Sequence, residues 1–411
     1  MNKRILFCAD GYAVHTQEWL RLLEGTDWDV HVSVGGGVPP CPIDATFHTL
    51  DAKAENPAGN RARPFWPWRR GAGRVCILRF GRGPDAESKR FAALIRKLRP
   101  TIVHSLRLQN EGYCVLGALP AVRQTAAKWI VSLWGSDLCY FGDDPDHRAR
   151  IEAVMRTCDY ITADCVRDLH LSRQLGASAE QLYFDHAIPG NGGLDIEAIR
   201  RRIREPDPAQ RRIVLIPKAR EDRFHRFAPV VDALRFAAPA LDGFSLVFLG
   251  ANQASREQIA RLPSELQRRC EVYSTVPREQ VLDWMARSRV MVAPSLSDGT
   301  PNVMLEAMAI GALPILSPLA SIREWLEDGN NGLLESNENA PQLARAITRA
   351  CSDDALVQQA AERNLEIVTH RADRHHVRTK ILAMYDRIDQ AAVGPRLAEK
   401  GVRPARFCTA G

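Results

Sequence analysis

The chain has 411 residues, of which 45% are hydrophobic and 25% are charged, so its composition is that of an ordinary globular protein. Its 27 glycines and 25 prolines are too few for a collagen-like or low-complexity chain. At about 150 residues per domain, the length predicts two or three domains. The formal net charge of +6 is mildly basic, and where the excess lies matters more than its size.

Apolar runs alternate with amphipathic segments along the first half, which is typical of βαβ units in a parallel sheet. Five strands are expected, at residues 4–9, 29–34, 101–105, 129–133 and 160–163. Five helices are expected between them, at residues 14–24, 85–98, 110–124, 148–157 and 165–175. Residues 36–83 are rich in proline, glycine and arginine and predict a long excursion with one strand near 75–79.

The basic excess is concentrated between Arg61 and Arg99, where 12 lysines and arginines face two acids. Such a stretch suits phosphates, lipid head groups or nucleic acid, or it is simply a solvated basic face. Trp66 and Trp68 beside arginines favour contact with an anionic membrane surface over nucleic acid. The first apolar run is too short for a signal peptide, and no run reaches the length of a membrane span. Any membrane contact is therefore expected to be peripheral.

Ten cysteines are scattered through the chain without C-x-x-C pairs or zinc-like spacing. This pattern predicts reduced thiols, no metal site and a cytoplasmic protein, placed at the inner face of the plasma membrane if it contacts a membrane.

The second half repeats the alternation of strands and helices. Strands are expected at residues 213–217, 245–250, 270–274, 290–293 and 313–316. Helices are expected at residues 226–237, 253–262, 277–286, 302–310, 321–327 and 340–351. The predicted organisation is a first domain at 1–188, a linker at 189–211, a second domain at 212–372, a helix at 373–390 that packs back on the first domain, and a weakly ordered tail at 391–411. The linker has hinge composition, with Gly192, Gly193 and a charged run.

The most informative segment runs from Val290 to Ile315 and predicts a strand, a loop, a helix, a turn and a strand. Its helix begins near Pro301 and Asn302, after a parallel strand, and open α/β sheets bind ligands at the carboxyl ends of their strands. The free amides and the dipole of a helix N-terminus attract anions. The segment therefore predicts a phosphate or diphosphate site at residues 299–304.

Two acids, Asp298 and Glu306, are placed on either side of this anion site. Carboxylates would repel an anion unless they bind hydroxyl groups, and a sugar and a ribose flanking a diphosphate supply such hydroxyls. The alternative is that Asp298 caps the helix and Glu306 is a surface acid.

This segment resembles the signature of glycosyltransferase family 4, in which two glutamates are separated by seven residues. The matching residues are Gly299, Pro301, Leu305, Glu306, Ala307, Met308, Ala309 and Gly311. The resemblance implies an α/β protein with the GT-B fold, which has two Rossmann-like, doubly wound parallel-sheet domains facing a central cleft. It implies that Asp298 holds the transferred sugar and that Glu306 holds the nucleotide ribose. The first acid is Asp here, one methylene shorter, which leaves open the hydroxyl that it contacts.

The same resemblance assigns further donor contacts. The main chain at Thr300, Pro301, Asn302, Val303 and Met304 would bind sugar hydroxyls and the diphosphate. Lys218 matches a family arginine and Arg223 a family lysine that bind the diphosphate, with Arg220 and Arg226 as alternates to Arg223. Gly250 stands where the family often has glycine, and Val276 lies in the segment whose backbone reads the nucleobase.

In the first domain, Gly11 fits the family's glycine-bearing loop on the acceptor side. Asp137 keeps the place of an acid that follows a family histidine, and that histidine is Trp134 here. Asp137 either binds an acceptor hydroxyl or caps the next helix. His104, at a strand end, is either functional or a hydrogen-bonded structural residue.

The prediction is a retaining glycosyltransferase of hexosyltransferase type, with catalytic roles for Asp298, Lys218, Arg223 and Asp137. It moves a sugar from a UDP- or GDP-sugar to a saccharide or lipid-linked saccharide, in surface polysaccharide or lipopolysaccharide synthesis. No Asp-x-Asp suits a metal clamp, so metal independence and no further cofactor are expected. The alternatives are an epimerase or phosphorylase of the same architecture, or a non-catalytic basic module that binds membrane or nucleic acid.

Overall fold

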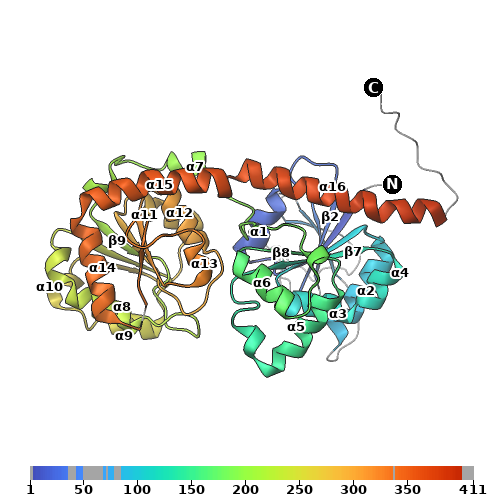
Figure 1. Cartoon of the computed structure of the whole chain (residues 1–411), viewed down its shortest axis with the longest axis horizontal. Helices are drawn as coiled ribbons and strands as arrows, with labels where there is room; N and C mark the ends of the chain where they lie inside the picture. Colours follow the sequence, from blue (N-terminus) through green and yellow to red (C-terminus); the bar gives the residue numbers. More distant parts are fainter. Residues whose placement is uncertain are drawn as a thin grey trace. The chain divides into compact units, whose positions relative to one another are not determined.

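The computed structural model describes residues 3–35, 43–49, 68–70, 73–77, 85–336 and 338–399. The chain forms two compact units, Met1–Gly192 with Arg378–Gly411, and Gly193–Val377 (Figure 1). Each unit has its own sheet with helices on both faces. The predicted α/β fold with two doubly wound sheets is confirmed, and every recorded strand pair is parallel except one at an edge of the first sheet.

The first unit is built on an eight-stranded sheet with the order β4-β5-β3-β2-β1-β6-β7-β8. Its strands are β1 (Arg4–Cys8), β2 (Asp29–Val34), β3 (Thr46–Thr49), β4 (Trp68–Arg70), β5 (Gly73–Ile77), β6 (Ile102–Leu106), β7 (Lys128–Leu133) and β8 (Tyr160–Ala163). In the central strand, Ile5, Leu6 and Phe7 are fully buried because helices cover both faces of the sheet.

The helices of the first unit are α1 (Val14–Arg21), α2 (Ala86–Leu98), α3 (Tyr113–Gly117), α4 (Leu119–Gln124), α5 (Pro145–Thr157), α6 (Val166–Gln174) and most of α16 (Arg374–Glu399). The helix predicted at 110–124 is instead two short helices, α3 and α4, that meet at Ala118, and the backbone at Gln109 and Asn110 before them is not helical. Arg107 and Asn110 there have φ angles of 100° and 63°, which non-glycine residues rarely adopt. The helix α16 continues to Glu399, past the predicted end at residue 390.

The second unit is built on a six-stranded parallel sheet with the order β11-β10-β9-β12-β13-β14. Its strands are β9 (Ile213–Ile216), β10 (Ser245–Leu249), β11 (Cys270–Tyr273), β12 (Val290–Val292), β13 (Leu313–Leu316) and β14 (Leu333–Leu334). Its helices are α7 (Ile196–Arg200), α8 (Ala228–Phe236), α9 (Gln253–Ile259), α10 (Ser264–Gln267), α11 (Arg278–Ala286), α12 (Asn302–Ile310), α13 (Ala320–Arg323), α14 (Ala340–Ser352) and α15 (Asp354–Ala372).

Six strands and helices of the fold were not predicted from the sequence: β3, β4, β14, α7, α10 and α15. The three strands are short, and β3 and β4 lie in the proline- and glycine-rich excursion, where no period is visible. The helix α15 starts directly after α14, with the Asp353 carboxylate accepting a hydrogen bond from the Leu356 amide. Its buried residues recur at helical spacing, so the sequence does carry a signal for this helix; they are Leu356, Val357, Ala360, Asn364, Val368 and Ala372.

A buried polar network joins α16 to the sheet of the first unit. The Tyr385 hydroxyl accepts a hydrogen bond from Trp19 Nε1 and lies against His104 Nδ1, both at 2.8 Å. His104 Nε2 lies 2.9 Å from the Ser132 hydroxyl. Burial lowers the pKa of His104 to about 3, so the ring is neutral at physiological pH. Of the two roles considered for His104, the structure shows the hydrogen-bonded structural one.

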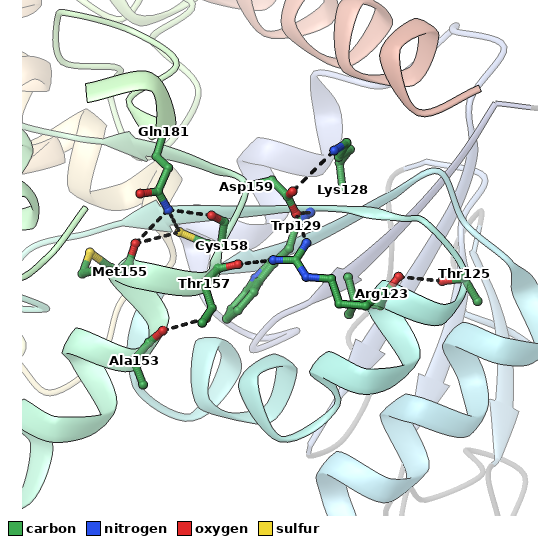
Figure 2. Close-up of polar contacts among 11 residues, drawn as sticks. Arg123, Thr125, Lys128, Trp129, Ala153, Met155, Thr157, Cys158, Asp159 and Gln181 are labelled. Carbon is green, nitrogen blue, oxygen red and sulfur yellow. Dashed lines mark hydrogen bonds and ion pairs between the residues drawn. The ribbon is translucent and has the colours of Figure 1, made fainter. Parts of the chain in front are cut away.

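A second polar cluster fastens the amino ends of β7 and β8 (Figure 2). The Asp159 carboxylate accepts hydrogen bonds from Arg123 at 2.8 Å and from the Trp129 amide at 2.9 Å. Gln181 donates to the carbonyls of Met155 at 2.8 Å and Cys158 at 2.6 Å. These contacts lie at the strand ends opposite to those where α/β sheets bind ligands, so we assign them to stability.

Most of the basic stretch at 61–84, including Trp66, lies outside the described residues, so the predicted membrane contact is not tested. Within the part of the chain that the structure describes, none of the helices combines the length and the apolar character needed to cross a membrane.

The network around Tyr385 generates a stability prediction. The substitution Tyr385→Phe removes the acceptor of Trp19 Nε1 in a buried site, and an unsatisfied buried donor costs about 1–3 kcal/mol. We expect the free energy of unfolding, measured by urea denaturation, to fall by about that amount. Tyr273→Phe, which removes an exposed hydroxyl bonded to Glu271, is the control and should change it by less than about 0.5 kcal/mol. Equal effects of the two substitutions would contradict this account.

Candidate active site

The helix α12 presents its N-terminus at the carboxyl edge of the second sheet. Pro301 is the N-cap residue and provides no capping side chain, while the amides of Met304 and Leu305 bond to its carbonyl. The helix is anchored because every residue from Met304 to Ile310 is buried. The dipole of this anchored helix places positive potential at the edge of the sheet where this sheet type binds ligands.

Asp298 and Lys218 form an ion pair beside this helix end. The Lys218 ammonium follows β9 and lies 2.5 Å from Asp298 Oδ2, and about a fifth of each side chain is exposed. Asp298 Oδ1 accepts a hydrogen bond from the Gly299 amide at 3.0 Å, and the Asp298 carbonyl accepts one from Ser321 at 2.8 Å. The structure thus brings together two predicted site residues that are 80 positions apart in the sequence.

Glu306 is a buried acid, not a surface acid as one alternative had it. Its side chain is only 4% exposed, and its Oε1 atom accepts hydrogen bonds from Arg278 Nε at 3.1 Å and Nη2 at 2.8 Å. Arg278 is the first residue of α11. Taking a carboxylate out of water is costly unless it is paired, so the guanidinium makes this position tenable for an acid.

The sequence analysis missed Arg278, although a signal was present. A cation in the first turn of a helix is unfavourable because it faces the positive end of the helix dipole. An arginine at such a position indicates a nearby acid, and this acid can lie far away in the sequence. The partner's identity is set by the tertiary fold, because α11 and α12 are separated in sequence by the strand β12.

The remaining residues of the donor-side prediction surround this centre. Trp325 Nε1 donates to the Thr300 hydroxyl at 3.0 Å, which fixes the loop before the helix. Met304 is fully buried, so its side chain belongs to the core, and its amide already donates to the Pro301 carbonyl at 3.0 Å. Gly250 has a φ of 77°, which favours glycine at the end of β10. Val276 is half-buried, two residues before α11.

Arg223 is an exposed residue of the loop after β9. Its guanidinium is 5.5 Å from the centre of the Phe224 ring, and the Phe224 carbonyl accepts a hydrogen bond from the Leu296 amide at 2.8 Å. This bond joins the loop after β9 to the loop after β12. The alternates are engaged elsewhere, because Arg220 pairs with Asp222 at 2.8 Å and Arg226 with Glu338 at 3.6 Å.

Asp137 and Gly11 belong to the first unit. Asp137 is buried, and its Oδ2 atom accepts hydrogen bonds from the amides of Leu108 at 3.0 Å and Trp134 at 3.1 Å. Leu108 and Trp134 both precede Asp137 in the chain, so these bonds are not the predicted capping of the next helix, and contact with an acceptor hydroxyl stays a prediction. Gly11 is buried, and its carbonyl accepts a hydrogen bond from Gln17 at 2.5 Å at the start of α1.

Among the described residues, one group has ligand atoms close enough together to share a cation. It consists of Asp164, Cys165 and Asp168 in the first unit, with atoms within 4.8 Å of one another. Asp168 pairs with Arg167 at 2.8 Å, and Asp164 accepts a hydrogen bond from the Gly135 amide at 3.2 Å. Since the chain's own cation and amide engage these acids, we assign the group to the structure of the β8–α6 turn.

Comparisons with known proteins show what kind of protein this chain is similar to. Residues 211–353 match the model "Glycosyl transferases group 1", and residues 86–165 match "Glycosyl transferase 4-like". The chain is 25% identical over 247 residues to a D-inositol 3-phosphate glycosyltransferase of Streptomyces bingchenggensis, covering 53% of this chain and 51% of that one. It is 28% identical over 142 residues to the lipopolysaccharide core biosynthesis glycosyltransferase LpsE of Rhizobium meliloti, covering 34% and 41%.

Solved structures show the same fold. The Anabaena protein HepE, in complex with UDP-glucose, aligns with a TM-score of 0.63 and 15% identity over 93% of this chain and 99% of that chain. Together these findings show the GT-B fold and a chain that is similar to glycosyltransferases in both of its units. The chain spans about half or less of the length of the first two curated relatives, so its own reaction and substrates are matters for proposal.

The buried Asp137 generates a prediction on pH. Burial raises its pKa to about 7, above the value of about 3.9 for an unfolded aspartate, so the native state holds a proton that the unfolded state loses. Its stabilising contribution is complete below about pH 4 and is lost as the pH rises through 7. The variant Asp137→Asn has no titrating group at this position and does not lose this contribution. The free energy of unfolding of the variant minus that of the wild type should therefore rise by about 1–3 kcal/mol between pH 5 and pH 8. Asp143→Asn, at an exposed position, is the control; an equally flat difference for both variants would refute the prediction.

Proposed function

We propose that the protein transfers a sugar, with retention of anomeric configuration, from a UDP- or GDP-sugar to a saccharide or lipid-linked saccharide. The observation that carries the proposal is the arrangement around the N-terminus of α12. Two carboxylates, Asp298 and Glu306, flank a centre of positive potential, and each is paired with a cation from another segment of the second unit. A ligand that carries both hydroxyl groups and a diphosphate matches this pattern of charges.

In this proposal the bound donor breaks the ion pair between Lys218 and Asp298 and makes its own contacts with each of the two side chains. The diphosphate takes the Lys218 ammonium and the amides at the start of α12, while the hydroxyls of the sugar donate to Asp298. Glu306 receives the hydroxyls of the ribose, and the main chain near Val276 contacts the base. The UDP-glucose complex of a structural relative supports a nucleotide-sugar donor.

The proposed reaction breaks the bond between the anomeric carbon and the β-phosphate oxygen. The acceptor oxygen attacks the same face of the sugar, and the departing phosphate oxygen takes the acceptor proton. Negative charge grows on the diphosphate as the bond breaks, so Lys218, Arg223 and the α12 amides stabilise the transition state. Because the chain supplies this charge itself, we propose a metal-independent reaction.

The acceptor class is proposed from chemistry and relatedness. A lipopolysaccharide core biosynthesis enzyme is among the relatives, and the basic sequence at 61–99 suits the anionic surface on which lipid-linked saccharides are built. We therefore propose a role in surface polysaccharide or lipopolysaccharide synthesis, with peripheral contact to an anionic membrane.

The role of the two acids is tested by Asp298→Asn and Glu306→Gln. Each variant should lower kcat/KM for transfer of a labelled sugar by about 100-fold, because hydrogen bonds from the donor to a charged partner are lost. Glu338→Gln, which changes a surface acid of the same unit, should leave transfer unchanged. If the label stays on the nucleotide as an epimer, or is released as a sugar phosphate, the enzyme is not a transferase.

The role of Lys218 is tested by Lys218→Met, with Arg235→Met as its control, since Arg235 is an exposed residue of the same unit that pairs with Asp232. Lys218→Met should lower kcat by about 10²–10³-fold, the usual effect of removing one group that stabilises developing charge. Wild-type transfer should persist in excess chelator. Complete loss that manganese restores would contradict metal independence, and wild-type kcat in Lys218→Met would contradict the assigned role.

A further inference from the structure

The pair formed by Arg278 and Glu306 connects two elements that the proposed donor would contact at opposite ends. Arg278 opens α11, two residues after Val276, where the base is proposed to bind. Glu306 lies in α12, whose N-terminus is proposed to bind the diphosphate. A nucleoside diphosphate spans the distance between a base and a diphosphate through its ribose, and the pair lies between these two elements.

We infer that Arg278 is a positioning residue for nucleotide recognition, which holds the Glu306 carboxylate in the orientation that receives the ribose hydroxyls. This inference rests on the proposed function. It commits the site to ribonucleotides, because a correctly held carboxylate distinguishes a ribose from a 2′-deoxyribose.

The geometry of the contact supports a positioning role. Two nitrogens of one planar guanidinium, Nε and Nη2, point at the same carboxylate oxygen, Oε1, at 3.1 and 2.8 Å. This arrangement restrains both the position of that oxygen and the direction from which it is approached. A lysine would supply charge from one nitrogen, without the planar fork.

The burial of Glu306 makes its pairing with Arg278 energetically important. The Glu306 side chain is 4% exposed, whereas Arg278 is 28% exposed. A carboxylate at this depth that loses its cation is left with an uncompensated charge, and it lowers that cost by taking up a proton or by turning toward other donors. Either change removes the fixed pair of acceptor sites that a ribose needs.

The other face of α11 offers a matched control. Arg202 pairs with Glu279 and, at 2.6 Å, with Asp283, both on α11 and both largely exposed. Arg202→Met therefore removes a cation that braces the same helix but does not touch Glu306. A general loosening of α11 affects both variants, whereas loss of carboxylate positioning affects only Arg278 variants.

The test is titration calorimetry of the full chain with UDP, GDP and their 2′-deoxy counterparts. The wild type should bind the better of the two ribonucleotides at least about tenfold more tightly than its 2′-deoxy form, as expected for a hydrogen bond to a charged group. In Arg278→Met this ratio should fall below about threefold, and in Arg202→Met it should stay at the wild-type value. Arg278→Lys, which keeps the charge, should give an intermediate ratio.

A double-mutant comparison separates positioning from simple charge neutralisation. If Arg278 acts through Glu306, then Arg278→Met combined with Glu306→Gln should show the same ratio as Glu306→Gln alone. If thermal unfolding shows that Arg278→Met does not fold, Arg278→Lys is used in its place. Arg278→Lys should then lose at least half of the wild-type discrimination between ribonucleotide and 2′-deoxyribonucleotide, measured on a logarithmic scale.

Three results would overturn the inference. The first is an Arg278→Met variant that keeps the wild-type ratio of ribonucleotide affinity to 2′-deoxyribonucleotide affinity. The second is an Arg278→Met variant that binds the ribonucleotide more tightly than the wild type does, which would make Arg278 a competitor of the ribose for Glu306. In either case the proposed function stands, because the nucleotide binds. The third is a wild-type protein that binds neither UDP nor GDP, and this result would remove the proposed function together with the inference.

Discussion

The proposed site depends on two carboxylates beside the positive end of a helix, each paired with a cation from another segment of the chain. The loops after β9 and β12 meet through Lys218 and Asp298, and the segments around β11 and α12 meet through Arg278 and Glu306. A parallel sheet makes this possible because the carboxyl ends of its strands share one edge. Residues far apart in sequence thus contribute to one charged centre.

The same charges explain why the site suits a sugar nucleotide better than a simple anion. A helix N-terminus with a lysine alone would bind phosphate, but the acids would oppose it. An acid is favourable where a hydroxyl group donates to it, so the alternation of cation and carboxylate matches a ligand that alternates phosphate and polyol. Glu306 extends this pattern into a nearly dry environment, where each polar contact is stronger and each unpaired group more costly.

The sequence predicted this region well because its signals are local. The helix expected at 302–310 is α12 to the residue, and the strand before it and the positions of Asp298 and Lys218 follow from the alternation of strands and loops. The partners of the acids could not be derived in the same way. Arg278 meets Glu306 only because α11 packs beside α12, and the ion pair of Lys218 with Asp298 depends on the β9–β12 pairing.

In the first unit the sequence was less informative about individual side chains. Asp137 and His104 were conspicuous at strand ends, yet the fold uses them as buried hydrogen-bonding groups, the one for loop amides and the other for Tyr385 on a helix 281 positions later. The non-helical backbone at Asn110 was invisible because a residue with a positive φ carries no periodicity. The decisive contacts there are tertiary.

The most direct measurement of the central claim is a crystal structure of the protein with an intact UDP- or GDP-sugar. The account predicts the diphosphate at the first amides of α12 with the Lys218 ammonium turned to it, sugar hydroxyls on Asp298, and the ribose on a Glu306 carboxylate still held by Arg278. A nucleotide bound elsewhere, or bound at this edge with Asp298 and Glu306 making no contact to its hydroxyls, would contradict it.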